Sequence, residues 1–281
     1  MKPVITAFDH VLVGVGDLEA GRINWERLGF TACPRGRHIG WGTANYCLMF
    51  QNDYVELLGI VDPSQFTNNL DRFLEERSEG LLAGAYRSSD IDGDVAELRR
   101  RGLTVDGPKD LARIIEHPDG ELRPRFRLMH FDPASRPGFL AFASQHLTPE
   151  MVWQAPWMEH ANGARAITGF LAVAEDLEAA ERAGVAWFGD EQVQRAGDSL
   201  TMRAGELTLE LVTPAAAAGR FGARLPAGFE GGPLGFTVAV ADLARCRELL
   251  QSRGVDFDEV DGEVRLPAAE ANGVLLTFVE E

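Results

Sequence analysis

Residues 8–18 read FDHVLVGVGDL, and this pattern occurs four times along the chain. In each copy an apolar run typical of a β-strand ends in Asp followed by Leu or Ile, and an amphipathic stretch then ends in Gly. The copies are Phe8–Leu18 with Gly29, Leu81–Ile91 with Gly102, Ile167–Leu177 with Gly184, and Leu234–Leu243 with Gly254. From Asp to Gly there are 12 residues in three copies and 8 in the third. Such regular repetition predicts four copies of one structural unit.

Each unit is expected to begin with a strand and continue with a helix. The Asp occupies the N-cap position, where its carboxylate can accept hydrogen bonds from free backbone N–H groups, and the Gly occupies the position that ends a helix. Extended segments bounded by turn residues follow each Gly. In the first unit they are Ala44–Phe50 and Tyr54–Ile60, and in the second Glu121–His130 and Gly138–Gln145. The unit is therefore β-α-β-β-β.

One such unit cannot bury the inner face of its own sheet, so we expect the units to pair around shared cavities. The chain of 281 residues is long enough for two domains of roughly 100 to 200 residues. We predict an α+β fold in which four βαβββ modules pair into two domains with curved mixed sheets. The domains cover residues 1–150 and 164–281. The connector, residues 151–163, contains Trp153 and Trp157 and is expected to pack on the first domain, over its cavity.

The bulk composition describes a soluble globular protein, with 45% hydrophobic and 25% charged residues. The net charge of −16 argues against nucleic acid and against an anionic membrane surface as partners, because both require a basic face. There is no signal-peptide pattern and no apolar run of the ~20 residues needed to span a bilayer, so a cytoplasmic location is expected. The three cysteines are odd in number and widely spaced, which favours reduced thiols.

Three segments together carry a family resemblance: residues 8–18, the glycine-rich run GRHIGWGTAN at 36–45, and YVELL at 54–58. They resemble the vicinal-oxygen-chelate superfamily of glyoxalase I, bleomycin-resistance proteins and extradiol dioxygenases, and in particular its glyoxalase-like domain subgroup. The resemblance implies a divalent metal held in the cavity by residues from the first and last strands of two paired units. Such a metal binds two neighbouring oxygens of a small-molecule substrate.

Transferring the ligand positions one by one places His10 and Glu56 at two of them. The paired unit has Ala83 and a position near Ala141, and neither side chain can coordinate a metal. In the C-terminal pair only Glu210 aligns with a ligand position. We therefore expect any chemistry in the N-terminal pair, and a scaffold or homodimerisation role for the C-terminal pair.

His10 and Glu56 suit Zn, Mn, Fe or Ni, but catalytic sites normally have three protein ligands and an open position. The candidates for the third ligand are His146, at the end of the last strand of the second unit, and His38, before the glycine-rich turn. Strand alternation directs Gln145 inward and His146 outward unless a bulge intervenes. The predicted metal site is His10, Glu56 and His146, with His38 as the alternative.

The same residues allow chemistry without a metal. Glu56 has apolar neighbours, so burial would raise its pKa and let it act as a general base beside a histidine. His38 is a second catalytic candidate. Arg125 is a third, because residues 123, 125 and 127 alternate, and an arginine on the cavity side could clamp a substrate carboxylate. The usual position of such a charged face is the wet outer one.

Substrate contacts are predicted from the glycine-rich turn and the connector. The predicted substrate-binding residues are Arg37, Trp41, Asn45, Trp153 and Trp157. Two functions fit these residues. One is a metal-dependent lyase, isomerase or dioxygenase acting on a small oxygenated metabolite. The other is a metal-free binding or resistance protein for an aromatic or amphipathic molecule, with the tryptophans as stacking surfaces.

Overall fold

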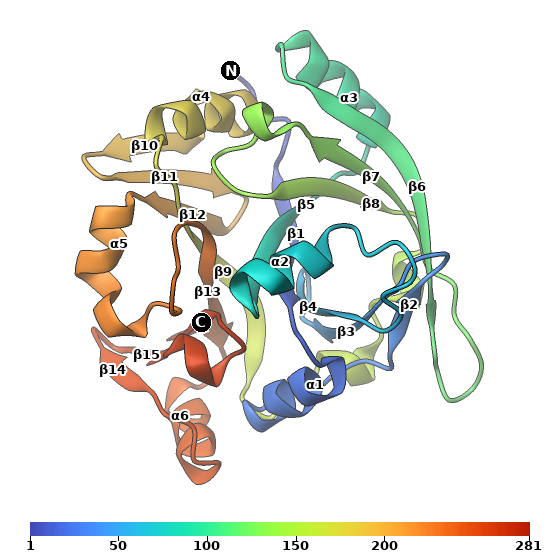
Figure 1. Ribbon diagram of the computed structural model, residues 1–281, viewed down its shortest axis with the longest axis vertical. Coiled ribbons are helices and arrows are strands. Elements are labelled where there is room, and N and C mark those ends of the chain that lie inside the picture. Colours follow the sequence, from blue (N-terminus) through green and yellow to red (C-terminus); the bar gives the residue numbers. More distant parts are fainter.

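The computed structural model describes residues 1–281 and contains four β-α-β-β-β units in succession (Figure 1). The first is β1 (Ala7–Gly14), α1 (Leu18–Arg27), β2 (Gly36–His38), β3 (Thr43–Met49) and β4 (Tyr54–Ile60). The second is β5 (Gly80–Arg87), α3 (Ile91–Arg100), β6 (Val105–Ile115), β7 (Arg125–Phe131) and β8 (Ala141–His146). The third is β9 (Ala164–Val173), α4 (Leu177–Phe188), β10 (Val193–Ala196), β11 (Ser199–Ala204) and β12 (Leu207–Val212). The fourth is β13 (Gly232–Val240), α6 (Leu243–Ser252), β14 (Asp258–Val260), β15 (Glu263–Leu266) and β16 (Leu275–Glu280).

Two further helices, α2 (Leu70–Arg77) and α5 (Pro214–Phe221), join the units within each pair. The sequence analysis did not anticipate either helix. None of the helices combines the length and the apolar character needed to cross a bilayer.

The predicted N-caps are present in all four units. Asp17 accepts hydrogen bonds from the backbone N–H groups of Glu19 and Ala20 at 2.9 Å. The aspartates at 90, 176 and 242 each accept from the N–H group three residues later. These bonds satisfy donors that have no partner within the helix, so the repeated Asp fixes where each helix begins.

The third helix does not end where the sequence indicated. We expected it to end at Gly184, but α4 continues to Phe188 and ends at Gly189, which has a φ of 86°. Gly184 lies inside the helix against β11, where a Cβ would collide with the sulfur of Met202. The glycine therefore serves close packing rather than capping, which explains why the third Asp-to-Gly spacing was short.

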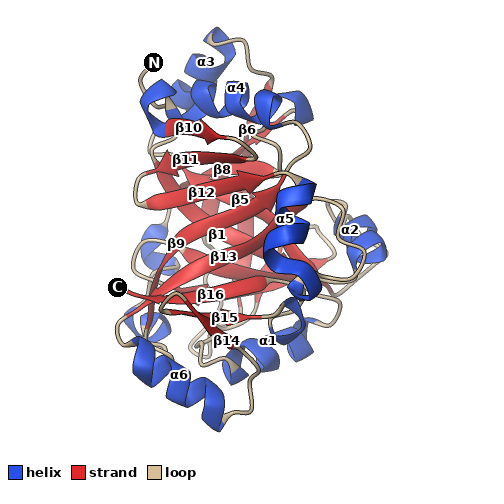
Figure 2. Cartoon of the chain, turned by 90° about the vertical axis from the view of Figure 1, so that its left-hand side faces the viewer, coloured by secondary structure: helices blue, strands red, loops and turns tan.

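Each pair of units forms one eight-stranded mixed sheet, as predicted. The first sheet is a closed barrel in the order β1-β4-β3-β2-β6-β7-β8-β5. Here β1 runs parallel to β4 and antiparallel to β5, while pairing of β2 with β6 closes the ring. The second sheet has the order β10-β11-β12-β9-β13-β16-β15-β14 and stays open at β10 and β14 (Figure 2).

The two sheets share one hydrophobic core, a cluster of 53 buried residues from both halves of the chain. Phe170 of β9 packs against Phe139 and Phe8 of the barrel, with ring centroids 4.8 and 6.4 Å apart. Trp187 of α4 packs on Phe131 at 3.9 Å. The outer wall of the barrel is thus covered by the second sheet and its helix.

Strand β6 is a long strand that the sequence analysis missed. Its 11 residues include Gly107 and Pro108, which are uncommon inside strands, and its first half is mostly polar. The expected strand Glu121–His130 begins only at Arg125, because Pro124 cannot donate to a strand ladder. The error matters, since β6 closes the barrel and contributes to the cavity wall.

A buried carboxylate at the junction of the two sheets gives a stability prediction. Asp53 accepts a hydrogen bond from the N–H group of Ile167 at 3.0 Å. Burial, only partly offset by this bond, raises the pKa of Asp53 from 3.8 to about 7. A raised folded-state pKa contributes stability below about pH 4 that is lost as the pH rises through 7. We expect Asp53→Asn to be about 2 kcal/mol more stable than the wild type at pH 8, and less so at pH 5.

The measurement is urea unfolding of both proteins at the two pH values. The difference in the free energy of unfolding between variant and wild type is compared at each pH, because contributions from the titration of the histidines are common to both proteins and cancel. A difference that does not depend on pH would contradict this account of Asp53.

Candidate functional site

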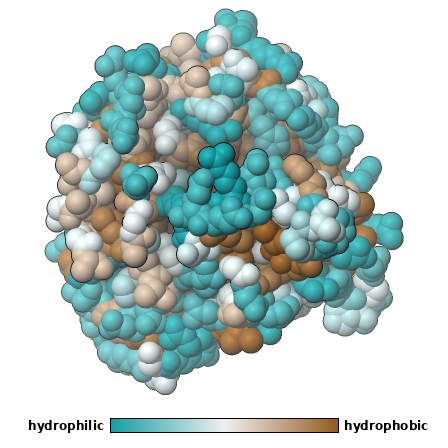
Figure 3. All heavy atoms as spheres, viewed as in Figure 1, coloured by the Kyte–Doolittle hydropathy of each residue, from teal (hydrophilic) through white to brown (hydrophobic).

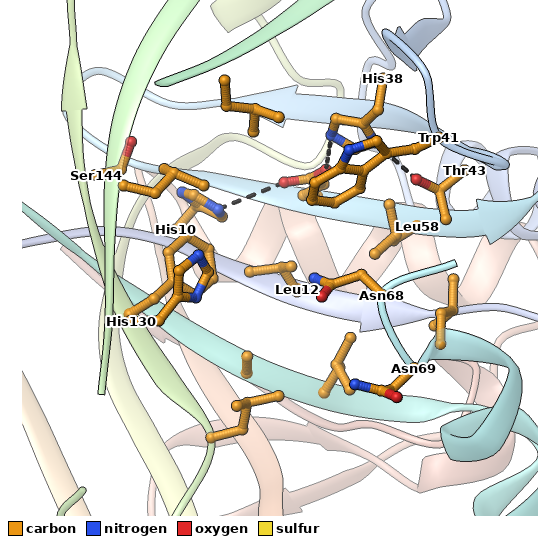
Figure 4. Close-up of a pocket in the computed structure, with 18 of the residues that line it drawn as sticks. His10, Leu12, His38, Trp41, Thr43, Leu58, Asn68, Asn69, His130 and Ser144 are labelled. Carbon is orange, nitrogen blue, oxygen red and sulfur yellow. Dashed lines mark hydrogen bonds and ion pairs between the residues drawn. The ribbon is translucent and has the colours of Figure 1, made fainter. Parts of the chain in front are cut away.

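The barrel encloses a cavity of about 260 Å³ lined by 23 residues. Most of the wall is apolar and comes from Leu12, Leu58, Leu82, Leu111, Phe126, Leu128 and Phe142. The polar groups on the wall include His10, His38, Thr43, Glu56, Asn68, Asn69, Arg113, His130, Arg136 and Ser144 (Figure 4). An apolar cavity with a few convergent polar groups is the usual form of a small-molecule site.

A bulge in β1 brings two consecutive polar side chains together. The register of β1 against β5 shifts between Phe8 and His10, so Asp9 is the extra residue, and it is fully buried. Asp9 Oδ2 lies 2.7 Å from His10 Nδ1 and 3.0 Å from His146 Nε2. Arg87 Nε donates to Asp9 Oδ1 at 3.0 Å.

These contacts keep Asp9 ionised. Burial would raise the pKa of Asp9, but the charge of His146 and the hydrogen bonds from both histidines outweigh it and hold the pKa well below its usual range. The carboxylate fixes the His10 ring with Nδ1 as the donor to Asp9, so Nε2 faces the cavity.

Glu56 faces the other nitrogen of that ring. His10 Nε2 lies 3.4 Å from Glu56 Oε2, and His38 Nε2 lies 3.9 Å from Oε1, as the dashed lines in Figure 4 show. Asn45 Nδ2 donates to Glu56 Oε1 at 2.6 Å, and Tyr54 stacks on His10 at 4.3 Å. The structure therefore brings together four of the predicted site residues, at 10, 38, 45 and 56. Asn45, predicted to contact substrate, is buried and does not line the cavity.

Arg113 on β6 is a buried cation of this site that the sequence analysis missed. Its Nη1 donates to Cys47 Sγ at 3.1 Å, and its guanidinium lies 5.5 Å from the centre of the Phe126 ring. The alternation of Leu111, Arg113 and Ile115 is a signal that could have identified it, but the polar first half of β6 concealed the strand.

Arg113 also changes the expected chemistry of Glu56. Burial would raise the pKa of Glu56, but the charges of His10, His38 and Arg113 and the Asn45 hydrogen bond outweigh it and lower the pKa. The expectation of a raised pKa is therefore wrong. The lowered pKa favours the ionised form of Glu56.

The donor set does not fit the predicted divalent metal. No three His, Cys, Asp or Glu side chains are arranged to hold an ion. His146, predicted as the third ligand, has its Nε2 bound to Asp9 on the Nδ1 side of His10, away from Glu56. Ala83, on the neighbouring strand β5, lines the cavity without a donor. In place of a metal, Arg113 supplies the permanent positive charge near Glu56.

Two arginines predicted for the site lie elsewhere. Arg37 is exposed and pairs with Glu121 at 3.0 Å and with Glu116 at 3.5 Å. Arg125 is exposed on β7 and does not line the cavity. Both side chains lie on the outward-facing side of their strands, and water solvates their charges there.

Of the three predicted tryptophans, only Trp41 lines the cavity, packed edge-on against Phe66 at 5.0 Å. Trp153 packs on Tyr54 and His146 at 6.0 and 4.8 Å, and its Nε1 donates to the Phe50 carbonyl oxygen. Trp157 is buried in the same apolar cluster as Tyr54 and also stays outside the cavity. The connector packs on the barrel, as expected, but does not roof the cavity.

The aligned carboxylate of the second sheet is already neutralised. Glu210 Oε2 pairs with Arg220 Nη1 at 2.6 Å, and Gly169 occupies the position that His10 occupies in the first unit. This concave face therefore has no counterpart of the imidazole–carboxylate pair.

Comparison with known proteins places this geometry in a family. Residues 8–188 match the family model described as a glyoxalase-like domain, and no protein of curated function matches the sequence. A hypothetical protein from Staphylococcus aureus has a TM-score of 0.71 at 12% identity, covering 98% of this chain and 99% of its own. A variant of 4-hydroxymandelate synthase from Streptomyces coelicolor has a TM-score of 0.64 at 13% identity, covering 99% and 92%. These likenesses show the fold, which is that of the vicinal-oxygen-chelate superfamily. The chain belongs to the glyoxalase-like domain family.

Proposed function

We propose that this protein is a lyase or isomerase of the glyoxalase type that moves a proton on a small oxygenated metabolite within the barrel. The observation that carries the proposal is the His10–Glu56 pair, whose nearest atoms are 3.4 Å apart on the cavity wall. Asp9 orients the imidazole from behind. A carboxylate that fixes the tautomer of a histidine is the arrangement that general-base catalysis uses.

In the proposed step, His10 Nε2 takes a proton from a substrate carbon next to a carbonyl group. The electron pair of the C–H bond forms an enolate, whose negative charge rests on the carbonyl oxygen. Asp9 and Glu56 stabilise the imidazolium that forms, and Arg113 offsets the negative charge on the wall. When the deprotonated carbon carries a hydroxyl group, the hydroxyl proton passes to the former carbonyl oxygen and the abstracted proton returns to the former carbonyl carbon, which completes an isomerisation. In a lyase, the enolate instead re-forms the carbonyl group and expels a leaving group from the carbon beyond the deprotonated one.

His38 is suited to a second proton transfer. Burial lowers the pKa of His38; the charge of Glu56 opposes this shift and the charge of Arg113 adds to it. Its Nδ1 lies 2.8 Å from Thr43 Oγ1, and the side chain lines the cavity. An imidazole on the wall can deliver or accept a proton. His38 would do so beside His10, because both rings face the carboxylate of Glu56.

A second candidate function is a binding protein without turnover. Two features favour a binding protein. Ala83 lines the cavity with a side chain that can neither coordinate a metal nor transfer a proton, and Trp41, packed on Phe66, offers an aromatic surface to a ligand. Metal-dependent lyase or dioxygenase chemistry has less support, since it needs a third ligand that the donor set lacks.

Exchange of substrate hydrogen with solvent distinguishes the two functions. In D2O, with a set of 2-oxo acids and α-hydroxy ketones, we expect the wild type to exchange the proton next to the carbonyl of at least one compound, followed by proton NMR. His10→Gln and Glu56→Gln should slow this exchange at least about 100-fold, because each removes part of the acid–base pair.

The matched control is Glu210→Gln, which alters the aligned carboxylate of the second sheet and should leave exchange unchanged. Undiminished exchange by His10→Gln would overturn the assignment of the base. Binding of these compounds without exchange would instead support the binding protein.

Removal of metal provides a separate prediction. We expect the exchange rate to survive dialysis against EDTA, and Zn²⁺, Mn²⁺, Fe²⁺ or Ni²⁺ to leave the melting temperature unchanged, because an ion bound to the native state would raise it. Elemental analysis checks this directly. One equivalent of metal that persists through dialysis and disappears in His10→Ala would contradict the metal-free assignment.

A further inference from the structure

The cavity lining is rich in positive charge, although the chain as a whole carries a net charge of −16. Among the 23 lining residues Glu56 is the single carboxylate, whereas Arg113 and Arg136 are both guanidiniums. Glu56 is the lining carboxylate whose charge acts on Arg113, although the two side chains form no ion pair. This leaves Arg136 as a cation on the wall without a matching anion.

Arg136 follows the short turn Pro133–Ser135 at the end of β7. Its Nε donates to the Phe131 carbonyl oxygen at 2.8 Å, which anchors the guanidinium, and the side chain takes part in no ion pair. The nearest charge that favours it is Asp132, which accepts from the N–H group of Ala134. Arg136 also borders a surface groove that contains Glu175, with which it forms no ion pair.

Partial burial lowers the pKa of Arg136, which means that its positive charge is incompletely solvated. A guanidinium in that condition gains from a carboxylate, which can accept two parallel hydrogen bonds from it. Its terminal nitrogens have no protein acceptor.

His130 on β7 lines the same cavity as Arg136. Burial and the charges of Lys109 and Arg136 lower the pKa of His130. Its ring stacks on Phe142 with centroids 5.7 Å apart, and the same Phe142 ring lies 5.6 Å from His10. The ring of Phe142 therefore contacts both histidines, and Figure 4 shows His10 and His130 near each other on the wall.

Between these polar groups the cavity is apolar. Leu12, Leu82 and Ala83 contribute to the wall, and Leu140 is 37% exposed at its edge. Phe66, which contacts Trp41, is 56% exposed. Apolar surface lies next to helix α2 on the face shown in Figure 3. A ligand that spans the cavity meets apolar groups along its body.

We propose that Arg136 and His130 form an anion subsite, and that the cavity takes an amphipathic monocarboxylate: an apolar body whose carboxylate binds Arg136 while its oxygenated carbon lies at His10. The proposal deepens the proposed function and rests on it for the position of the reacting carbon. Arg136 is the one unbalanced cation on the wall, so the cavity favours a ligand with a single carboxylate over a polyanion. The apolar contacts favour an apolar body for the same ligand.

The test uses isothermal titration calorimetry with 4-phenylbutyrate and its neutral isostere 4-phenylbutanamide. We expect the wild type to bind the acid at least about tenfold more tightly than the amide. Arg136→Gln should abolish this preference without changing the affinity for the amide, and Arg136→Lys should restore part of it. Arg125→Gln is the matched control, because it removes an exposed arginine outside the cavity and should change neither affinity.

A second measurement needs no variant. Raising the NaCl concentration should weaken binding of the acid to the wild type and leave the amide unaffected. Equal affinities for acid and amide would overturn the anion subsite while the exchange assay still decides the proposed function. A preference that survives in Arg136→Gln would overturn the assignment to Arg136, and failure of both probes to bind would overturn the amphipathic class.

Discussion

The cavity depends on one buried anion, the carboxylate of Asp9. A buried charge with no solvent exposure needs hydrogen-bonding or charged partners. The partners of Asp9 are His10 of β1, His146 of β8 and Arg87 of β5. These three strands are neighbours in the barrel. The bulge that places Asp9 beside His10 therefore links the closure of the barrel to the orientation of its proposed base. Loss of the carboxylate would disturb both.

The two buried carboxylates of the site have different partners. Asp9 contacts His10 and His146 and pairs with Arg87 at 3.0 Å, and the charge of His146 and the hydrogen bonds of both histidines lower its pKa. The pKa of Glu56 falls because of the charges of His10, His38 and Arg113. The imidazole of His10 lies between the two carboxylates.

The repeated pattern was sufficient to predict the unit, its number and the pairing of units, because helix caps and strand runs are local features. The resemblance and the glycine-rich run, rather than the repeat, pointed to His10, His38, Trp41, Asn45 and Glu56, and the structure places these residues near one another. It failed where the decisive feature was not local. The bulge at Asp9 redirects a side chain against strand parity, β6 is a strand despite Gly107 and Pro108, and the position of Trp153 depends on how the connector packs. These contacts join residues far apart in the sequence, so no local hydrophobic periodicity predicts them.

The covering of the barrel by α4 has a consequence for the minimal folding unit. Trp187 packs on Phe131, donates to the Ser135 carbonyl oxygen at 2.9 Å, and accepts from the backbone of Val4 and Ile5. The family match ends at residue 188, immediately after this side chain. A polypeptide cut at the connector would leave its aromatic wall in water. A folding unit that keeps this aromatic wall covered therefore extends past the connector and includes β9 and α4 of the neighbouring sheet.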